Sequence, residues 1–289
     1  MRIARWDPAD EKTTLACYET HRAAQQADDP VEPPMSEGTF RVYLSEGFDH
    51  HPGEVWAAYD DAETVAGFYR LDLPDLENTN RAFLGLVVHP AARRGGTGRE
   101  LLRHGAGRAG ASGRTILDGV AVTGGAGEEF ARAIGAKLSL AEVRRIQYLG
   151  KIAPGVVAGL RADAARAAAG YSLVSWTGEI PEEYLAGAAE VFNAFNDAPH
   201  GEGVEDEVWD ANRVRERTGT LQRLGLMRGY GIAALHDASG AMAGFTAVLI
   251  DPEQPQWAFQ QLTAVVRAHR GHRLGLLLKT AMLELLGKK

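Results

Sequence analysis

Residues 87–102 read VVHPAARRGGTGRELL, and this stretch decides the fold. It continues a mostly apolar run, residues 81–89 (RAFLGLVVH), which is typical of a strand buried on both faces. The glycine-rich turn then opens a helix, so free backbone N–H groups and the positive helix end meet at one point. Glycines let a ligand approach the backbone closely, and Arg93, Arg94, Arg99 and Arg103 add positive charge. The pattern predicts a pyrophosphate site.

The rest of the first half predicts a small α+β domain around this turn. Alternating apolar residues and capping signals predict strands and helices in the order strand, two helices, hairpin, buried strand, turn and helix. A further strand begins at residue 115, a helix covers 128–134, and residues 142–149 alternate as a closing strand. The expected ranges before the turn are 2–6, 10–28, 36–47, 54–59, 64–73 and 81–89.

The second half repeats this order from residue 171 onward, which indicates an internal duplication. The hairpin segments VAGFYRLDL (65–73) and MAGFTAVLI (242–250) fall at matching places. We expect a first domain over residues 1–150, an alanine-rich linker helix over 151–170, and a second domain over 171–289.

Composition excludes several classes of protein. The chain has 289 residues, of which 45% are hydrophobic and 24% charged, as in ordinary globular proteins and unlike disordered ones. No apolar run reaches the ~18 residues that a membrane helix needs. A net charge of −7 argues against general nucleic-acid binding. With no apolar signal-peptide core and a single cysteine, Cys17, the expected compartment is the cytoplasm, and the arginine-rich, alanine-rich composition suggests a bacterial source.

The turn resembles motif A of the GCN5-related N-acetyltransferases (GNATs), R/Q-x-x-G-x-G/A. Arg93, Gly96 and Gly98 match its fixed positions. The resemblance implies an acyl-CoA N-acyltransferase fold with mixed sheets flanked by helices. It also implies that acetyl-CoA is the co-substrate, held by the end of the buried strand and the turn. The implied cofactor-binding residues are Leu86, Val87, Val88, Arg93, Arg94, Gly95, Gly96, Thr97, Gly98 and Arg99.

The second half carries a weaker copy of the same motif, in which Arg273 replaces the first glycine. Two copies resemble a tandem acetyltransferase, similar in layout to mycothiol synthase. The second-copy cofactor candidates are Val265, Val266, Arg270, Gly271, His272, Arg273, Leu274 and Gly275. The chain continues only from Gly275 to Lys289, so we expect this copy to be incomplete at its C-terminus and one side of its cofactor cleft to be missing.

The general acid and base of the implied reaction are not evident. The position of the family's carboxylate falls near Ala82, and the position of its tyrosine falls at Ala131, beside Phe130. The resemblance therefore leaves the catalytic residues unknown, with Asp72, Tyr69 and His89 as weak candidates. Mid-strand Gly85 suggests a β-bulge that opens the cleft.

Other functions remain open at this stage. Asp118 follows Gly98 at the spacing at which a dinucleotide-binding fold places its ribose-binding acid, but Leu101 stands in place of the third glycine. His269 and His272 lack the companion ligands of a metal site, so no metal is expected. The arginine-rich residues 212–223 favour a solvated face over a nucleic-acid surface.

The favoured function is transfer of an acetyl group from acetyl-CoA to a primary amine of a small molecule. The alternative is a non-catalytic acyl-CoA-binding or scaffold protein with a GNAT fold. We expect no nucleic-acid or membrane partner. An unpaired strand edge in the second domain would have to be covered, either by domain–domain burial or by a homodimer.

Overall fold

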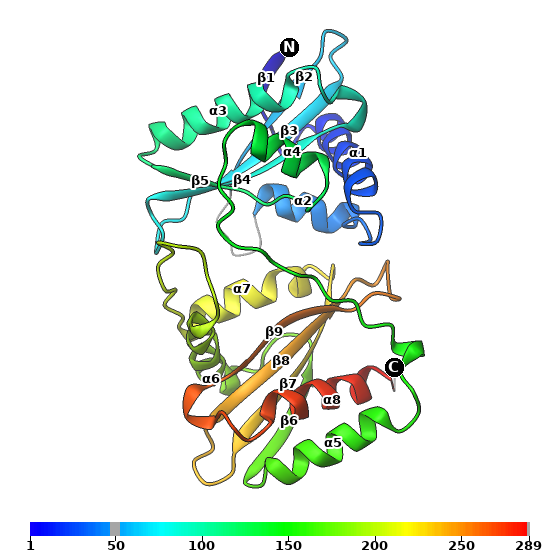
Figure 1. Ribbon diagram of the computed structural model, residues 1–289, viewed down its shortest axis with the longest axis vertical. Helices are drawn as coiled ribbons and strands as arrows, with labels where there is room; N and C mark the ends of the chain where they lie inside the picture. Colours follow the sequence, from blue (N-terminus) through cyan, green and yellow to red (C-terminus); the bar gives the residue numbers. More distant parts are fainter. Residues whose placement is uncertain (47–52, 288–289) are drawn as a thin grey trace. The chain divides into compact units, whose positions relative to one another are not determined.

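A computed structural model describes residues 1–46 and 53–287, and the chain divides into two compact units, Met1–Ser139 and Leu140–Lys289. Each unit is a β-sheet flanked by helices, which confirms the predicted α+β tandem fold (Figure 1). In the part of the chain that the structure describes, no helix is long and apolar enough to cross a membrane.

The first unit is built on a five-stranded sheet in the order β1-β2-β3-β4-β5. All neighbours are antiparallel except β4 and β5, which run parallel. Its elements are β1 (Arg2–Arg5), α1 (Glu11–Asp28), α2 (Glu37–Ser45), β2 (Glu54–Tyr59), β3 (Val65–Asp72), β4 (Arg81–Val88), η1 (Pro90–Ala92), α3 (Thr97–Ala111), β5 (Ile116–Asp118) and α4 (Ala126–Ala133).

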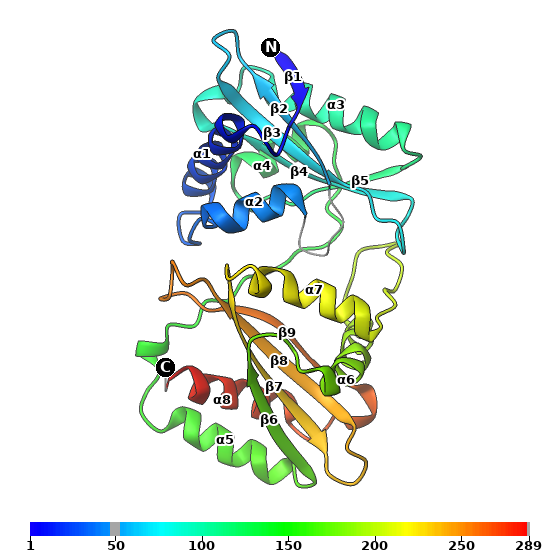
Figure 2. The ribbon, with the colours of Figure 1, turned by 180° about the vertical axis from the view of Figure 1, so that it is seen from behind.

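Helices cover both faces of this sheet because strand side chains alternate between the faces (Figure 2). Phe40 and Leu44 of α2 pack with Phe68 on one face, together with Cys17 of α1. Leu101 of α3 packs against the opposite face, in a cluster with Tyr69, Leu71, Ala82 and Leu84. The core therefore fixes α3, and with it the glycine-rich turn, against β3 and β4.

The second unit is built on a four-stranded antiparallel sheet in the order β6-β7-β8-β9. Helices α5 and α8 pack in one buried cluster with the sheet, and α6 and α7 pack in another. Its elements are η2 (Leu149–Lys151), α5 (Val156–Ala167), β6 (Tyr171–Thr177), α6 (Glu182–Asn193), η3 (Ala194–Asp197), α7 (Ala211–Arg223), β7 (Arg228–His236), β8 (Met242–Ile250), β9 (Phe259–Val265), η4 (Arg267–His269) and α8 (Leu274–Leu286).

The predicted linker helix lies within the second unit. Ala164 and Ala168 are buried against α8 residues, and Arg161 pairs with Glu284 at 3.1 Å. The boundary between the two compact units falls after Ser139, whereas the sequence suggested a boundary after residue 150. Helix α5 thus packs as part of the second core.

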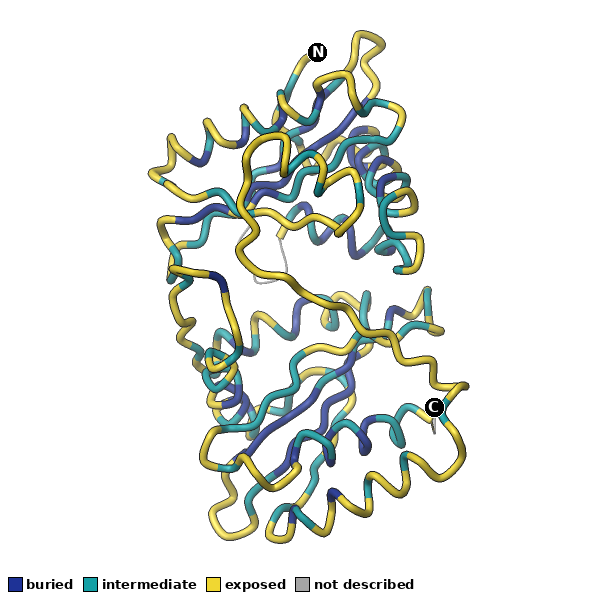
Figure 3. Tube along the Cα trace, viewed as in Figure 1, coloured by how far each residue is buried: buried dark blue, intermediate teal, exposed yellow. Residues whose placement is uncertain are grey.

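The closing strand predicted over residues 142–149 is wrong. Residues 140–148 form no strand or helix, and most of the chain from 133 to 151 is exposed (Figure 3). Leu138 and Val143 are 83% and 68% exposed. Alternation specifies a strand only where a partner strand supplies hydrogen bonds and an apolar face, and this segment pairs with neither sheet.

Candidate functional site

The glycine-rich turn of the first unit has the geometry of an anion site. After η1, Arg94 and Gly96 take positive φ angles of 66° and 94°, and α3 begins at Thr97. In the described structure, no acceptor within the protein takes the backbone N–H groups from Gly95 to Gly98, whereas Arg99 N–H already bonds Gly96 at 3.0 Å. Consecutive unsatisfied N–H groups at a helix start favour a bound phosphate.

Arg93, predicted to hold the cofactor, is bonded to partners within the protein. Its guanidinium makes a two-pronged ion pair with Asp28 at the end of α1, with both N–O distances at 2.7 Å. Its Nε donates to the carbonyl of Val88 at 3.3 Å. Arg93 therefore ties α1, the end of β4 and the turn together, while the exposed side chain of Arg94 lies 3.9 Å from Glu129 of α4.

Within the described residues, strand β4 has an unpaired edge next to the turn. Strand β4 pairs with β3 from residue 83 to residue 88 and with β5 only over residues 81–83. Beyond that point no described strand pairs with the second edge of β4. The peptide groups of Leu86 and Val88 point to this free edge, whereas those of Val87 face β3. The cofactor residues predicted from the sequence include residues of this edge.

Gly85 does not mark a bulge, because the β3–β4 register is regular throughout. A Cβ at Gly85 would lie 2.8 Å from the hydroxyl of Tyr43, so the glycine makes room for that side chain. Arg70 lies against the Tyr43 ring, 4.7 Å from its centroid, and pairs with Asp72. Burial raises the pKa of Tyr43, which keeps its hydroxyl protonated at neutral pH. The sequence did not predict that Tyr43 and Arg70 lie beside β4, because this placement depends on the packing of α2 against β3.

The structure accounts differently for each of the three weak catalytic candidates. Tyr69 is fully buried on the α3 side, where its hydroxyl lies 2.6 Å from Nδ1 of His104. Asp72 is held by Arg70, with Nε–Oδ1 at 2.8 Å. His89 caps η1 by accepting from Ala91 N–H at 3.2 Å. The three side chains do not converge on one site.

No tyrosine occupies the expected place on α4. Ala131 stands there, and the ring of its neighbour Phe130 lies 3.5 Å from the point that a Cβ on Gly98 would take. Ala82, at the expected position of the carboxylate, is buried and apolar. The first unit therefore has apolar side chains at the positions where the resemblance implies an acid and a base.

The second unit repeats the first turn, with Gly275 at the place of Gly98. Gly67 and Gly244 are equivalent, because a Cβ on either would meet the backbone of the next strand, at 2.7 Å from the carbonyl of Val87 and 2.6 Å from that of Ala264. Arg270 has the backbone angles of Arg93, with φ of −73° against −71° and ψ of 159° in both.

The arginine brace is also repeated. Arg270 donates to the Val265 carbonyl at 3.0 Å and to Asp197 at 2.7 Å, as Arg93 does to Val88 and Asp28. Gly271 and Arg273 take the left-handed angles of Arg94 and Gly96, with φ of 93° and 53°. The second turn thus keeps the backbone of the first, although a side chain replaces glycine at position 273.

The strand before the second turn differs from β4. Between Thr246 and Val248 of β8, the β9 partners step from Thr263 to Gln260, which inserts one extra residue into β9. The bulge expected at Gly85 is therefore found in the second copy instead. The described residues include no strand beside the outer edge of β9.

The alternative functions find little support in the geometry. Asp118 makes a two-pronged ion pair with Arg81, at 2.8 and 3.0 Å, across β4 and β5. His269 and His272 gather with His236 around Tyr171, with ring centroids 5.3–5.7 Å from the tyrosine ring. Among the described residues, no group of three His, Cys, Asp or Glu side chains is arranged to hold a metal ion.

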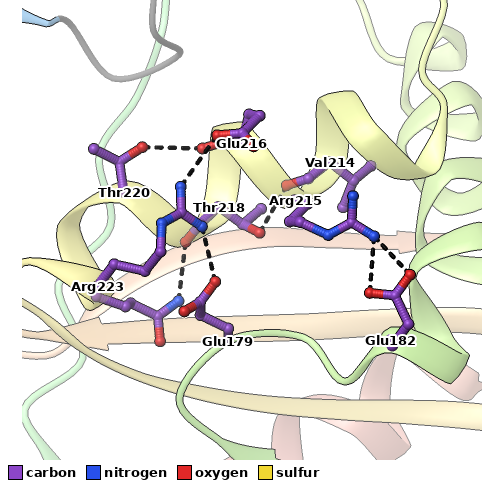
Figure 4. Close-up of polar contacts among 9 residues, drawn as sticks. Glu179, Glu182, Val214, Arg215, Glu216, Thr218, Thr220 and Arg223 are labelled. Atoms are coloured by element: carbon purple, nitrogen blue, oxygen red, sulfur yellow. Dashed lines mark hydrogen bonds and ion pairs between the residues drawn. The ribbon is translucent and has the colours of Figure 1, made fainter.

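Arginines of the arginine-rich helix α7 form ion pairs with neighbouring glutamates. Arg215 pairs with Glu182 at 2.6 Å, and Arg223 bridges Glu179 and Glu216 at 2.8 and 3.2 Å (Figure 4). These ion pairs are typical of a solvated charged face, and they give no support to a nucleic-acid-binding surface on α7.

Comparisons with known proteins agree with this geometry. Residues 51–133 match the family model of the acetyltransferase (GNAT) domain. No curated protein sequence matches the chain. Among solved structures, a tandem GNAT protein from the clavulanic acid biosynthesis pathway is 27% identical with a TM-score of 0.74, and the match covers 99% of this chain and 86% of that one.

A second similar structure is a GCN5-related N-acetyltransferase from Sphaerobacter thermophilus, at 16% identity and a TM-score of 0.60. That match covers 98% of this chain and 82% of the other, and it bears on the fold alone. The free N–H groups of the turn, the family match and the whole-chain likeness converge. Residues 51–133 belong to a GNAT acetyltransferase domain, and the chain as a whole has the fold of the tandem GNAT proteins.

Proposed function

We propose that this protein is an N-acetyltransferase that moves the acetyl group of acetyl-CoA to a primary amine of a small molecule. The proposal rests on one observation. The backbone N–H groups of the turn at Gly95–Gly98 have no acceptor within the described structure, and they lie next to the free edge of β4. Family membership supports acyl transfer in general.

The residues of the first unit fit such a ligand in two ways. The N–H groups of the turn can donate to a pyrophosphate, with Arg94 and Arg99 adding charge beside it. The peptide groups of Leu86 and the N–H of Val88, which face the free edge, can pair with an extended amide-bearing arm, as a neighbouring strand would. The acetyl thioester supplies the group that is transferred, and the amine must lose its proton before it attacks.

The second candidate function is acyl-CoA binding without catalysis. Ala131 and Ala82 stand at or near the positions where the family places a tyrosine and a carboxylate, and they favour this function because neither side chain moves a proton. Release of free CoA thiol with a panel of primary amines distinguishes the two functions, since a binder releases none with any amine.

Calorimetric titration with acetyl-CoA tests the binding step. Gly98 and Gly275 are matched positions at the second residue of α3 and of α8, and neither has a positive φ. A Cβ at Gly98 makes only ordinary contacts with Phe130 and Val88, and one at Gly275 meets nothing within 4 Å. A glutamate is tolerated at a helix start but repels a pyrophosphate there.

We expect Gly98→Glu to weaken acetyl-CoA binding at the first turn at least tenfold, which is about 1.4 kcal/mol or more. Binding that survives Gly98→Glu and disappears with Gly275→Glu would place the cofactor in the second unit instead. If the unaltered protein does not bind acetyl-CoA, the proposed function is wrong and the likeness is one of fold alone.

The state of association stays a prediction. An unpaired strand edge such as that of β9 invites pairing with another chain. Light scattering during size-exclusion chromatography measures it, and a purely monomeric profile would reject the homodimer.

A further inference from the structure

The second unit contains a hollow between β9 and α8 that has no assigned role. Its volume is about 580 Å³, and it lies at the outer edge of β9, where no described strand pairs. Gln261 and Thr263 line it from the strand, and Gly275, Leu276 and Lys279 line it from the helix.

Lys279 is the one charged residue among these five. Its side chain is half-buried, and within the described structure it has no ion-pair partner, although the chain carries a net charge of −7. Burial lowers the pKa of Lys279, so more of this amine is neutral at a given pH than of a hydrated lysine. A neutral amine is the nucleophilic form.

The match of Gly275 with Gly98 shows that this lysine is specific to the second copy. Leu102 occupies the equivalent place on α3, while Thr263, Gly275 and Leu278 correspond to Leu86, Gly98 and Leu101. The first copy therefore presents an apolar side chain where the second copy presents an amine.

The hollow also lies where a thioester would be held in this copy. It starts at Gly275, beside the repeated turn, and follows the β9 edge to Thr263, next to the bulge. An acyl-CoA whose pyrophosphate is bound at the turn would extend its arm along this edge and past Lys279.

From this juxtaposition we propose that Lys279 is an acylation site of the protein itself, modified by acyl-CoA bound at the second turn. The Nζ lone pair attacks the thioester carbonyl carbon, the C–S bond breaks, and the sulfur leaves as CoA thiolate. The proton lost from Nζ protonates the thiolate or passes to water. The product is a neutral amide at the wall of the hollow. The inference rests on the proposed acyl-CoA chemistry and deepens it.

Peptide mapping by mass spectrometry tests this. The intact protein is incubated with isotope-labelled acetyl-CoA, and acetylation is followed at Lys279 and at the exposed lysines Lys12, Lys137 and Lys151. We expect the initial rate at Lys279 to be at least tenfold higher, to saturate with acetyl-CoA and to be suppressed by free CoA. Equal labelling at all four lysines, or no saturation, overturns the proposal.

Three variants sharpen the test. Lys279→Leu, which installs the first-copy residue, should remove the labelled peptide while the fold is kept. Gly275→Glu should abolish labelling of Lys279, whereas Gly98→Glu, the matched change in the first turn, should leave it unchanged. The opposite pattern overturns the assignment to the second turn.

Acetyl phosphate serves as a reagent that carries an acetyl group but no CoA. Labelling of Lys279 by acetyl phosphate that Gly275→Glu leaves intact shows that the variant keeps the amine accessible. The two proposals fail separately: absence of acetyl-CoA binding refutes the proposed function, whereas binding without acetylation of Lys279 refutes only this inference.

Discussion

The Arg93–Asp28 ion pair gives a prediction that distinguishes two roles of Arg93, which are stabilising the turn and binding a phosphate directly. Replacement Arg93→Met removes a two-pronged ion pair with N–O distances of 2.7 Å and a bond to the Val88 carbonyl. The two side chains are 22% and 28% exposed, so solvent weakens the pair without cancelling it. We expect a loss of about 2 kcal/mol in the free energy of unfolding of the first unit.

Such a loss should lower the melting midpoint of the first unit by roughly 6 °C in scanning calorimetry, at about 3 °C per kcal/mol. The matched change Arg270→Met should cost less than about 1 kcal/mol, since Arg270 is 43% exposed. Asp197 also keeps its bond to Arg267, at 2.6 Å, when Arg270 is lost.

A second variant provides the decisive result. Asp28→Asn weakens the brace and leaves the Arg93 guanidinium free to move. If Arg93 only braces the turn, acetyl-CoA binding should weaken in Asp28→Asn. If Arg93 instead holds a phosphate directly, binding should tighten, and Arg93→Met should abolish binding with a midpoint within about 1 °C of the unaltered protein. Either of these last results would refute the brace.

Three further predictions concern other contacts. Tyr69→Phe should cost about 1 kcal/mol in urea unfolding, by loss of the bond to His104, and leave acetyl transfer unchanged; a loss of transfer would return Tyr69 to the catalytic site. Burial, and then His236 and His272, lower the pKa of His269. Its contribution to stability is therefore complete above pH ~6.5 and is lost as the pH falls through the lower folded pKa. The urea midpoint of the second unit should drop as the pH falls below about 6.5, and an unchanged midpoint would contradict this. Gly244→Ala should destabilise the second unit by about 1–3 kcal/mol in thermal melts, because its Cβ would lie 2.6 Å from a carbonyl; a neutral effect would contradict the close approach.

Local patterns predicted much of the fold. The glycine-rich turn, the apolar strand before it and the paired segments VAGF and MAGF specified two copies of one order of elements. The structure keeps that order, with Gly244 and Gly275 at the places of Gly67 and Gly98. These features depend on backbone conformation and on side-chain periodicity within a few residues, which a sequence displays directly.

The failures share one cause, which is that the deciding partner lies far away along the chain. Residues 142–149 alternate like a strand, but nothing in their own sequence states that no strand pairs with them. A glycine in the middle of a strand, such as Gly85, suggests a bulge. The glycine is required there because a Cβ would collide with the hydroxyl of Tyr43 on helix α2.

The sequence by itself therefore determined the α+β tandem fold and the place of the glycine-rich turn, because a strand, a glycine-rich turn and a helix start are local. Only the tertiary structure decided what the side chains around the turn do. Arg93 of the turn is paired with Asp28 of α1, and Tyr69 of β3 turns to His104 of α3. Lys279 faces a hollow at the open edge of β9. Such roles follow from which faces pack together, and packing is settled by the whole core.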